Sequence, residues 1–260
     1  MPWNHEQGVY ARPNPSPTQP GLFERSRGAP AGPWSVSQVD AVTWLDGLPS
    51  ESVDLVITDP AYESLEKHRA KGTTTRLKVS DGSSNEWFPT FPNARFFALF
   101  EQLYRVLRDD SHCYVMVDQE TMFVVKPIAE HVGFTWWKGI VWDYGPRIGM
   151  GYHYRSRHQL VLFFEKGKRK LSNLGIPDVL NVPRVNKGYP TEKPVALCEI
   201  LVKQSSSPGE VVIDPFLGSG STGVAALQNG RRFWGTDVKD AALSLARERL
   251  SKVPFVEAAK

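Results

Sequence analysis

The sequence predicts an α/β fold in which a mostly parallel sheet carries helices on both faces. Short apolar runs rich in β-branched residues alternate along the chain with stretches whose apolar residues recur at helical spacing. Runs such as 52–58 and 112–117 are largely free of charge, which is typical of strands buried on both faces. With 260 residues, 41% of them hydrophobic, the chain is long enough to bury one sizeable core.

The N-terminal stretch differs from the rest of the chain. Residues 1–33 contain seven of the twenty prolines and few clustered apolar residues. Such a segment buries too little surface to offset the entropy lost on ordering. We therefore expect an extended proline-rich arm over residues 1–33, followed by one domain over residues 34–260.

The first half of this domain contains a predicted β-α-β unit. Its strands are expected over residues 52–58 and 112–117. The helix between them has an apolar stripe and is expected to begin after Asn93, which can cap it. Two further strands are expected over residues 134–142 and 159–165, joined by a loop rich in tyrosine and arginine.

The second half repeats the alternation. Thr191 is expected to cap a helix whose first turn holds residues 192–194. After this helix we expect, in chain order, a strand over 210–213, a helix over 221–228, a strand over 232–236 and a helix over 240–250.

A glycine turn joins the strand that ends near Asp214 to the next helix. Gly218, Gly220 and Gly223 have the spacing of the dinucleotide fingerprint, and Asp237 follows where an acid can hold a ribose hydroxyl. A nicotinamide oxidoreductase is therefore one hypothesis. However, the carboxylate of Asp214 would repel a pyrophosphate at this helix terminus. The same carboxylate suits a ligand with an ammonium and a sulfonium group, which S-adenosylmethionine presents.

A second turn, Asp59-Pro60-Ala61-Tyr62, follows the predicted strand over 52–58. Ligands of open α/β sheets bind at the carboxyl ends of strands, so this turn is a candidate site. If Asp59 and the carbonyl group of Pro60 accept hydrogen bonds from the exocyclic amine of a base, the nitrogen lone pair can face a methyl donor. Tyr62 offers a ring on which a base can stack.

Together these motifs resemble those of the exocyclic-amino DNA methyltransferases of the β class. The family motif D-P-P-Y or S-P-P-Y matches residues 59–62, although Ala61 replaces the usual second proline. The cofactor motif matches Asp-Pro-Phe-Leu-Gly-Ser-Gly-Ser-Thr at 214–222, and T-E-K-P matches 191–194. The resemblance covers roughly residues 35–250. It implies a Rossmann-like methyltransferase fold with a seven-stranded sheet, helices on both faces and a permuted motif order.

The resemblance also implies roles for individual residues. Asp59, Pro60 and Tyr62 would bind and activate the target amine. Asp40 would contact the adenine of the cofactor and Asp237 its ribose, with Thr191 and Lys193 near its carboxylate. The full set of expected cofactor-binding residues is Asp40, Thr191, Lys193, Asp214, Phe216, Gly218, Gly220, Ser221, Thr222 and Asp237.

The basic residues are unevenly distributed. The net charge is only +3, but residues 147–187 hold nine basic residues and two acidic ones. Basic loops beside a cleft are what contacts with DNA phosphates require. The candidate DNA-binding residues are Arg147, Arg155, Arg157, Lys168, Arg169 and Lys170. Short target-recognition insertions are expected over about 63–95 and 166–190.

Several classes of function and location are disfavoured. Neither Cys113 nor Cys198 follows a proline, and both are expected in the core, which argues against methylation at a cytosine ring carbon. His153 and His158 have no cysteine or carboxylate at metal-ligand spacing, so no metal is expected. The absence of a 20-residue apolar run or a signal-like N-terminus predicts a cytoplasmic protein without a membrane partner.

These inferences lead to a predicted enzyme. We expect a site-specific DNA methyltransferase that uses S-adenosylmethionine to methylate the exocyclic amine of a flipped base in double-stranded DNA, with adenine N6 as the expected target. Methylation of cytosine N4 is the first alternative. RNA or protein-amide methylation, a nicotinamide oxidoreductase and a catalytically silent DNA-binding module are further alternatives. A homodimer and a partner restriction endonuclease are options that the sequence leaves open.

Overall fold

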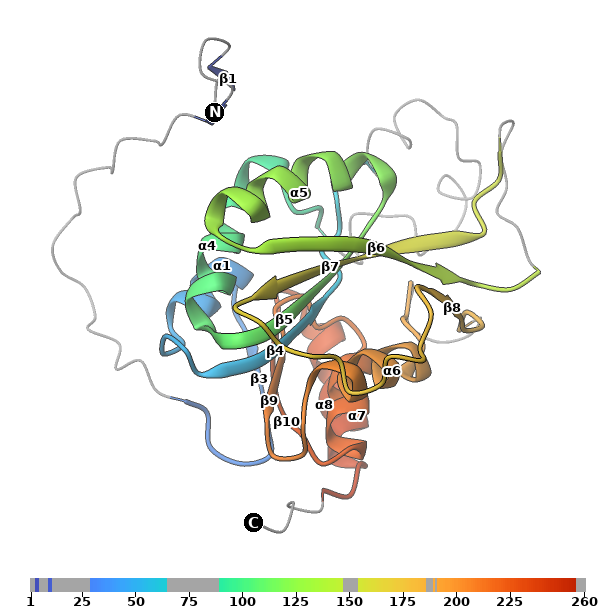
Figure 1. Cartoon of the computed structure of the whole chain (residues 1–260). Helices are drawn as coiled ribbons and strands as arrows, with labels where there is room; N and C mark the ends of the chain where they lie inside the picture. Colours follow the sequence, from blue (N-terminus) through green and yellow to red (C-terminus); the bar gives the residue numbers. More distant parts are fainter. Residues whose placement is uncertain are drawn as a thin grey trace, which may run out of the picture.

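The computed structural model describes residues 29–64, 89–146, 154–185, 189 and 191–255, together with the backbone of β1 (Trp3–Asn4) and β2 (Val9–Tyr10). A single mixed sheet with the strand order β3-β10-β9-β4-β5-β7-β6-β8 forms the centre of the molecule (Figure 1). Its eight strands are β3 (Trp34–Gln38), β4 (Val53–Thr58), β5 (Leu107–Val117), β6 (Thr135–Asp143), β7 (His158–Lys166), β8 (Val179–Asn181), β9 (Val211–Asp214) and β10 (Arg232–Asp237).

The direction of β7 decides which residues reach the functional end of the sheet. β3, β10, β9, β4 and β5 run parallel, whereas β7 is antiparallel to both β5 and β6. We call the end of the sheet at Thr58, Val117 and Asp214 the carboxyl edge, and the opposite end the amino edge. Because Val117 is opposite Leu160, β7 begins at the carboxyl edge and ends at the amino edge.

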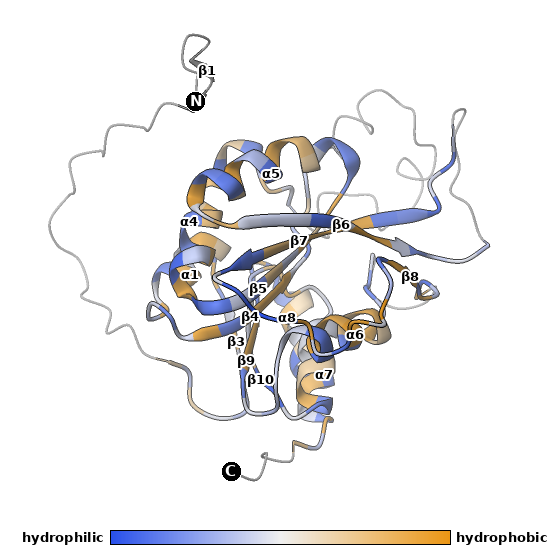
Figure 2. Cartoon of the chain, in the orientation of Figure 1, coloured by the Kyte–Doolittle hydropathy of each residue, from blue (hydrophilic) through white to orange (hydrophobic). Residues whose placement is uncertain are grey.

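Helices cover both faces of this sheet, as predicted (Figure 1). On one face lie α1 (Ala41–Asp46), α4 (Phe96–Val106) and α5 (Gln119–Val132), with the short 3-10 helix η2 (Asn93–Arg95) before α4. On the other lie α6 (Val195–Ser205), α7 (Ser221–Gln228) and α8 (Asp240–Ser251). Figure 2 shows hydrophobic and hydrophilic residues mixed along these helices, most of which bury one side. Helix α7 differs, because all of its residues except Gln228 are buried.

The central strand β4 shows why the sheet is stable. All six of its residues are buried, and its side chains enter two separate apolar clusters. Val53 and Val56 pack beneath α1 and α4, whereas Leu55 and Ile57 pack beneath α6 and α7. Each such side chain contributes about 1.5–3 kcal/mol when fully buried. This burial fixes the end of β4, and with it the turn that begins at Asp59.

The structure confirms the α/β class and corrects three details. The described sheet has eight strands where seven were predicted, since the short β8 adds to β6. Asn93 does not cap a helix: it lies inside η2, and its buried Oδ1 atom has no hydrogen-bond partner among the described residues. Thr191 does not cap α6 either, because α6 begins after Pro194. A residue that precedes proline is disfavoured in the helical region, so the helix cannot begin at residues 192–193.

The predicted insertion over residues 63–95 and the predicted arm over residues 1–33 are only partly described. Residues 65–88, most of the expected insertion over 63–95, lie outside the described residues. At the end of the predicted arm, Phe233 N donates to Pro33 O (2.9 Å) and the Arg232 guanidinium donates to Gly32 O (2.9 Å). Gly32 and Pro33, at the end of the predicted arm, therefore contact β10 of the sheet. No helix in the described part of the chain combines the length and the apolar character needed to cross a bilayer.

Candidate active site

Asp59 follows β4 at the carboxyl edge, and its carboxylate is held from two sides. Gln159 Nε2, at the start of β7, donates to Asp59 Oδ1 at 3.2 Å. The ammonium group of Lys193 forms an ion pair with Asp59 Oδ2. The sequence did not single out Gln159, and it assigned Lys193 to the carboxylate of a cofactor. In the structure both side chains contact the predicted catalytic carboxylate.

The rest of the Asp-Pro-Ala-Tyr turn is anchored to the chain around residue 91. Phe91 N donates to Ala61 O at 2.5 Å, and Tyr62 and Phe91 pair as a single parallel β-bridge outside the main sheet. Burial raises the pKa of the Tyr62 phenol well above 10, and the negative charges of Asp59 and Asp118 raise it further. Tyr62 therefore keeps its phenol proton at neutral pH.

A second contact holds the segment that follows Tyr62. The Ser64 hydroxyl donates to the Asp118 carboxylate. Asp118 follows β5 at the carboxyl edge and also accepts from Thr121 N (2.8 Å), which caps α5. The Asp-Pro-Ala-Tyr turn is thus held before Tyr62 by Phe91 and after it by Asp118, which follows β5.

The glycine turn after β9 requires the residues that the sequence predicted. Gly218 has φ +49° and Gly220 has φ +77°, backbone conformations that favour glycine. A Cβ atom at Gly220 would lie 3.0 Å from the Cβ of Ala246 in α8. A Cβ atom at Gly223 would lie 2.6 Å from Phe233 in β10. The first two glycines therefore permit the turn, and the third permits close packing of α7 on the sheet.

Asp214 is buried where β9 meets this turn. Its Oδ1 atom accepts hydrogen bonds from Thr58 Oγ1 (3.0 Å) and from Phe216 N (3.0 Å). Burial raises the pKa of Asp214 to about 7, and the charge of Asp59 adds to the increase. Because Thr58 directly precedes Asp59, the two predicted carboxylates of the site lie at the ends of adjacent paired strands.

Asp237 closes the other side of the glycine turn. Its Oδ2 atom accepts from Gly218 N (2.9 Å) and its Oδ1 atom from Lys239 N (2.9 Å). Tyr189 lies over the turn, since a Cβ atom at Gly218 would lie 3.6 Å from its Cε1 atom. Burial, together with the charge of Asp237, raises the pKa of Tyr189 to about 12. Tyr189 was not predicted as a site residue.

The segment Thr191-Glu192-Lys193-Pro194 connects the two halves of the site. Lys193 reaches Asp59, whereas Glu192 Oε1 forms an ion pair with Arg249 Nη1 at 2.9 Å. Arg249 Nη1 also donates to Ser219 O, inside the glycine turn, at 2.8 Å. Thr191 is exposed and has φ +59°. Lys193 therefore contacts the Asp-Pro-Ala-Tyr turn, and the adjacent Glu192 contacts Arg249, which supports the glycine turn.

The remaining predicted residues of the glycine turn are buried at the start of α7. Ser221 Oγ lies 3.2 Å from Ser219 Oγ, and Thr222 Oγ1 donates to the buried Cys198 thiol at 3.8 Å. Cys198 and Cys113 are both buried and free, as predicted.

Asp40 has partners that the sequence did not reveal. It caps α1 by accepting from Val42 N and Thr43 N, and the Arg95 guanidinium binds both of its carboxylate oxygens at 2.6 and 2.8 Å. The hydrogen bonds from Arg95 lower the pKa of Asp40. Arg95 lies over the ring of Phe91, which packs edge-on against Phe216 with ring centroids 5.1 Å apart. Asp40 is thereby connected to the glycine-turn side of the site.

The predicted DNA-binding residues are divided by the sheet. Arg147 lies outside the described residues. Arg155 and Arg157 directly precede β7, so they lie at the carboxyl edge with Asp59. Arg155 is exposed, whereas Arg157 forms a double hydrogen bond with Asp143 at 2.7 and 2.9 Å.

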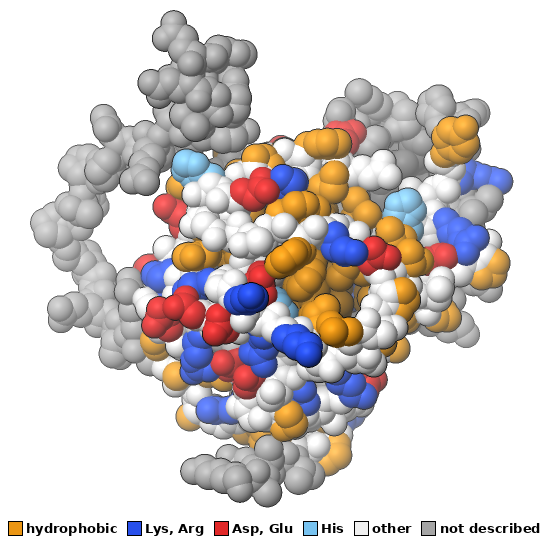
Figure 3. Space-filling view, viewed as in Figure 1, with side chains coloured by type: hydrophobic (Ala, Val, Ile, Leu, Met, Phe, Trp, Pro, Cys, Tyr) orange, Lys and Arg blue, Asp and Glu red, His pale blue; other side chains and the backbone are white. Residues whose placement is uncertain are grey.

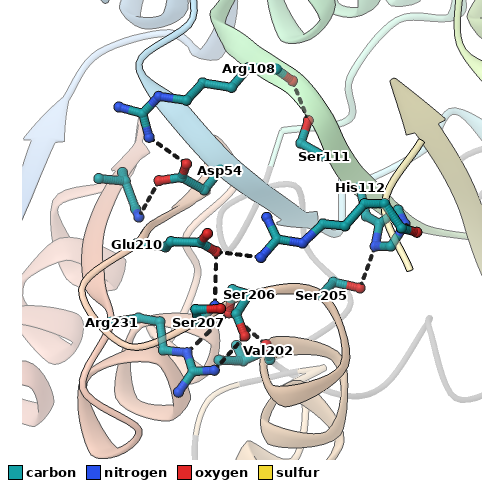
Figure 4. Close-up of polar contacts among 12 residues, drawn as sticks. Asp54, Arg108, Ser111, His112, Val202, Ser205, Ser206, Ser207, Glu210 and Arg231 are labelled. Atoms are coloured by element: carbon teal, nitrogen blue, oxygen red, sulfur yellow. Dashed lines mark hydrogen bonds and ion pairs between the residues drawn. The ribbon is translucent and has the colours of Figure 1, made fainter. Parts of the chain in front are cut away.

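The structure places Lys168, Arg169 and Lys170 at the opposite end of the sheet from the Asp-Pro-Ala-Tyr turn, and their contact with DNA stays a prediction. They follow the end of β7, which lies at the amino edge because β7 is antiparallel to β5. Arg169 Nη2 is paired there with Glu210 Oε2 at 2.7 Å. Figure 4 shows the polar contacts of this edge, where Glu210 also accepts from Ser207 N, and His112 contacts Ser205.

An apolar pocket elsewhere on the molecule is not part of this site. It has a volume of about 140 Å³ and lies between β6, β7, β8 and α6 (Figure 3). Tyr114, Phe163 and Ile200 are among its lining residues, and it includes no predicted site residue. Among the described residues, no three His, Cys, Asp or Glu side chains are grouped as metal ligands.

Comparison with known proteins gives the family. The DNA methylase model for N6 and N4 methyltransferases matches residues 53–185 and 172–248. The chain belongs to the N6/N4 DNA methylase family. The DNA adenine methyltransferase YhdJ of Escherichia coli (strain K12) is 26% identical over 249 residues, which cover 81% of this chain and 80% of YhdJ.

Two solved structures support the fold of this DNA methylase. The PvuII DNA methyltransferase, described as cytosine-N4-specific, has a TM-score of 0.67 at 18% identity and covers 84% of this chain and 86% of its own. The M1.HpyAVI–SAM complex has a TM-score of 0.62 at 20% identity and covers 84% and 100%. The predicted Rossmann-like fold is confirmed, and the predicted S-adenosylmethionine-dependent DNA methyltransferase is confirmed at the level of the family.

Proposed function

We propose that this DNA methylase transfers a methyl group from S-adenosylmethionine to the exocyclic amine of a base flipped out of double-stranded DNA, with adenine N6 as the target. The observation that carries the proposal is the position of Asp59. It lies at the end of β4, beside the buried Asp214 of the adjacent strand β9. A methyl acceptor at Asp59 and a cationic ligand at Asp214 would therefore be neighbours.

Asp59 and Pro60 supply the acceptors that a conjugated amine needs. The lone pair of such an amine is delocalised into the base, so the nitrogen is a weak nucleophile. Hydrogen bonds from the amine to the Asp59 carboxylate and to the Pro60 carbonyl oxygen favour a tetrahedral nitrogen whose lone pair can attack. As the bond between the methyl carbon and the amine nitrogen forms, the bond between that carbon and the sulfonium sulfur breaks and S-adenosylhomocysteine leaves. The positive charge that develops on the nitrogen is stabilised by the Asp59 carboxylate and is removed when an amine proton passes to solvent. Tyr62 supplies a neutral ring beside this position.

The residues around the glycine turn fit the cofactor. S-adenosylmethionine supplies an electrophilic methyl group on a sulfonium. Burial disfavours the charged form of the Asp214 carboxylate and so raises its pKa. A cationic ammonium group beside the carboxylate would favour the charged form and offset this cost of burial. Gly218 and Gly220 present no side chain to a ligand at these two positions of the turn. The Asp237 carboxylate beside them can accept further hydrogen bonds. The family resemblance places Lys193 near the cofactor carboxylate, and in the structure its ammonium group is paired with Asp59.

Arg155 and Arg157 support DNA as the substrate. Both lie at the carboxyl edge that carries Asp59, where cationic side chains can contact phosphates on either side of a flipped nucleotide. The basic group at 168–170 lies at the amino edge, so its contact with DNA needs a separate test.

The choice of adenine rests on Asp59 itself. An aspartate at the first motif position inclines this family toward adenine, whereas serine is commoner among cytosine enzymes. YhdJ is described as an adenine methyltransferase, while the PvuII enzyme is described as cytosine-N4-specific. Methylation of cytosine N4 therefore remains the alternative that the experiment must separate.

The test uses purified protein, double-stranded DNA and labelled S-adenosylmethionine. We expect label in the DNA, and digestion to nucleosides with mass spectrometry is expected to yield N6-methyladenine. Asp59→Ala is expected to abolish labelling while DNA binding is retained. The proposal is rejected if unlabelled DNA is recovered from protein that binds the cofactor. N4-methylcytosine as the product would overturn the assignment of the base alone.

Two partners that the sequence leaves open, a restriction endonuclease and a second copy of the chain, need separate measurements. Mapping the methylated positions gives the recognition sequence, and protection of those sites from a restriction endonuclease tests for the first partner. The mass of the protein in solution tests for a homodimer. RNA and protein acceptors in the same labelling assay test the remaining methyltransferase alternatives.

A further inference from the structure

We propose that Gln159 is a positioning residue for methyl transfer, whose side-chain amide fixes the orientation of the Asp59 carboxylate toward the target amine. This inference rests on the proposed function. Gln159 Nε2 donates to Asp59 Oδ1 at 3.2 Å, while Lys193 binds Oδ2. The two oxygens of one carboxylate are therefore held by donors from different elements.

The reversed direction of β7 brings Gln159 to this position. In a wholly parallel sheet, the first residues of a strand would lie at the amino edge, far from Asp59. Here Gln159 is opposite Trp142 in β6, and the next residue, Leu160, is opposite Val117 in β5. Pairing on both sides makes this part of β7 a rigid support, which holds a side chain more precisely than a loop does.

The number of acceptor sites leaves room for the substrate. An ionised carboxylate has about four lone-pair sites, two on each oxygen. Gln159 and Lys193 each occupy one, so each oxygen of Asp59 retains one site for an amine hydrogen. With both oxygens held, the carboxylate plane is fixed. Without Gln159 it is held at one oxygen only, and the terminal torsion of aspartate has a broad energy minimum.

The side chain of Gln159 is uncharged, and this matters for the positioning of Asp59 as much as the hydrogen bond does. Lys193 already places a full positive charge on Asp59. A second cation would withdraw more electron density from the carboxylate and would repel a cationic methyl donor. A carboxylate at position 159 could not donate a hydrogen bond and would repel Asp59. An amide orients the carboxylate without either effect.

The test compares Gln159→Met with a matched control, Gln102→Met. Both substitutions remove an amide from a half-buried glutamine that is bound to a charged side chain, because Gln102 accepts from Arg105 Nε at 2.8 Å. Gln102 lies in α4, away from Asp59. The measurements are the single-turnover rate of DNA methylation, the Kd values for S-adenosylhomocysteine and for DNA, the fluorescence of 2-aminopurine at the target base, and the thermal midpoint.

We expect Gln159→Met to lower the single-turnover rate about ten- to a hundredfold, with both Kd values within about twofold of wild type. Gln159→Glu keeps the size of the side chain and is expected to lower the rate further. This variant also tests the inference if Gln159→Met folds poorly. The 2-aminopurine signal is expected to persist, because the base still enters the site. Gln102→Met is expected to retain the wild-type rate.

The outcomes separate this inference from the proposed function. If wild-type protein methylates DNA and folded Gln159→Met does so at a rate within twofold, Gln159 has no positioning role. The same conclusion follows if the loss appears only in the Kd for DNA, or if Gln102→Met loses as much rate as Gln159→Met. If wild-type protein binds the cofactor analogue and DNA but methylates nothing, the proposed function itself fails.

Discussion

The ammonium group of Lys193 is paired with the carboxylate of Asp59, although the two residues are 134 positions apart in the chain. Both groups are largely withdrawn from solvent, with side-chain exposures of 13% and 24%. The next residue toward the N-terminus, Glu192, is paired with Arg249 in α8. The two sides of the site therefore share one short segment of chain.

The first prediction is that Lys193→Met lowers methylation activity more than it lowers stability. The Asp59 carboxylate loses its charged partner and is held by Gln159 alone, so we expect a single-turnover rate at least tenfold lower. The cost in folding free energy is expected to stay below about 2 kcal/mol, because the pair retains some access to water. Rapid-quench assays and urea unfolding give the two quantities.

Lys203→Met is the control for this substitution. Lys203 forms an ion pair with Glu199 in α6, but its side chain is 57% exposed. We expect little change in rate or stability. An equal loss of rate in the two variants would contradict a specific role for the pair between Lys193 and Asp59.

A second prediction concerns pH and the buried carboxylate of Asp214, whose pKa is raised to about 7 mainly by burial. Below about pH 7 the free protein holds a proton on Asp214, and a cationic ligand must displace it. The Kd for S-adenosylhomocysteine, which keeps the ammonium group, is expected to rise up to tenfold for each pH unit below 7. Above pH 7 it should level off.

The sign of the effect on folding is opposite. An aspartate with a raised pKa in the folded state holds a proton that the unfolded chain has released. The stability of the cofactor-free protein is therefore expected to fall as the pH rises from about 4 to about 7. Asp214→Asn should remove both dependences, and calorimetry across this pH range measures them. A Kd in wild-type protein that is flat from pH 6 to 8 would show that Asp214 is not the group that titrates.

Patterns that are local in the sequence were predictable, and long-range contacts were not. The strands at 52–58 and 232–236 were recognised because they are short, apolar runs, and the glycine turn because its spacing is specific. Helices α1 and α5 were missed because their apolar faces are interrupted by polar residues, and α5 contains Pro127. Strand β8 was also missed, because it has only three residues and forms by pairing with β6.

The same limit applies to the site. Asp59, Asp214 and Asp237 could be named because each ends a recognisable strand. Gln159 and Arg95 have no signal of their own, since their roles depend on tertiary contacts with Asp59 and Asp40. Residues 168–170 lie at the amino edge because of the direction of β7, which the pattern of apolar residues cannot reveal.

A third prediction concerns the support of the glycine turn by Arg249. Its guanidinium binds Glu192 and the carbonyl oxygen of Ser219, and the side chains of the ion pair are 23% and 12% exposed. Arg249→Leu is expected to raise the Kd for S-adenosylhomocysteine about three- to tenfold, because the turn loses the donor that fixes its backbone.

Lys252→Met provides the comparison at the C-terminal end of the same helix, α8. Lys252 is paired with Glu248, but the two side chains are 69% and 62% exposed, so this pair contributes little. Its Kd is expected to match that of wild-type protein. Titration calorimetry on the two variants tests the prediction, and equal affinities in Arg249→Leu and wild-type protein would overturn it.

The last prediction follows from the division of basic residues between the two edges of the sheet. Arg155 is exposed at the carboxyl edge with Asp59, whereas Lys168 is exposed at the amino edge. The two substitutions Arg155→Ala and Lys168→Ala remove the same charge, so any difference in DNA binding reports position. We expect Arg155→Ala to weaken DNA binding and to reduce the slope of log K against log salt by about 1, as the loss of one phosphate contact requires. Lys168→Ala should leave both unchanged. Equal effects of the two substitutions would mean that DNA also contacts the amino edge.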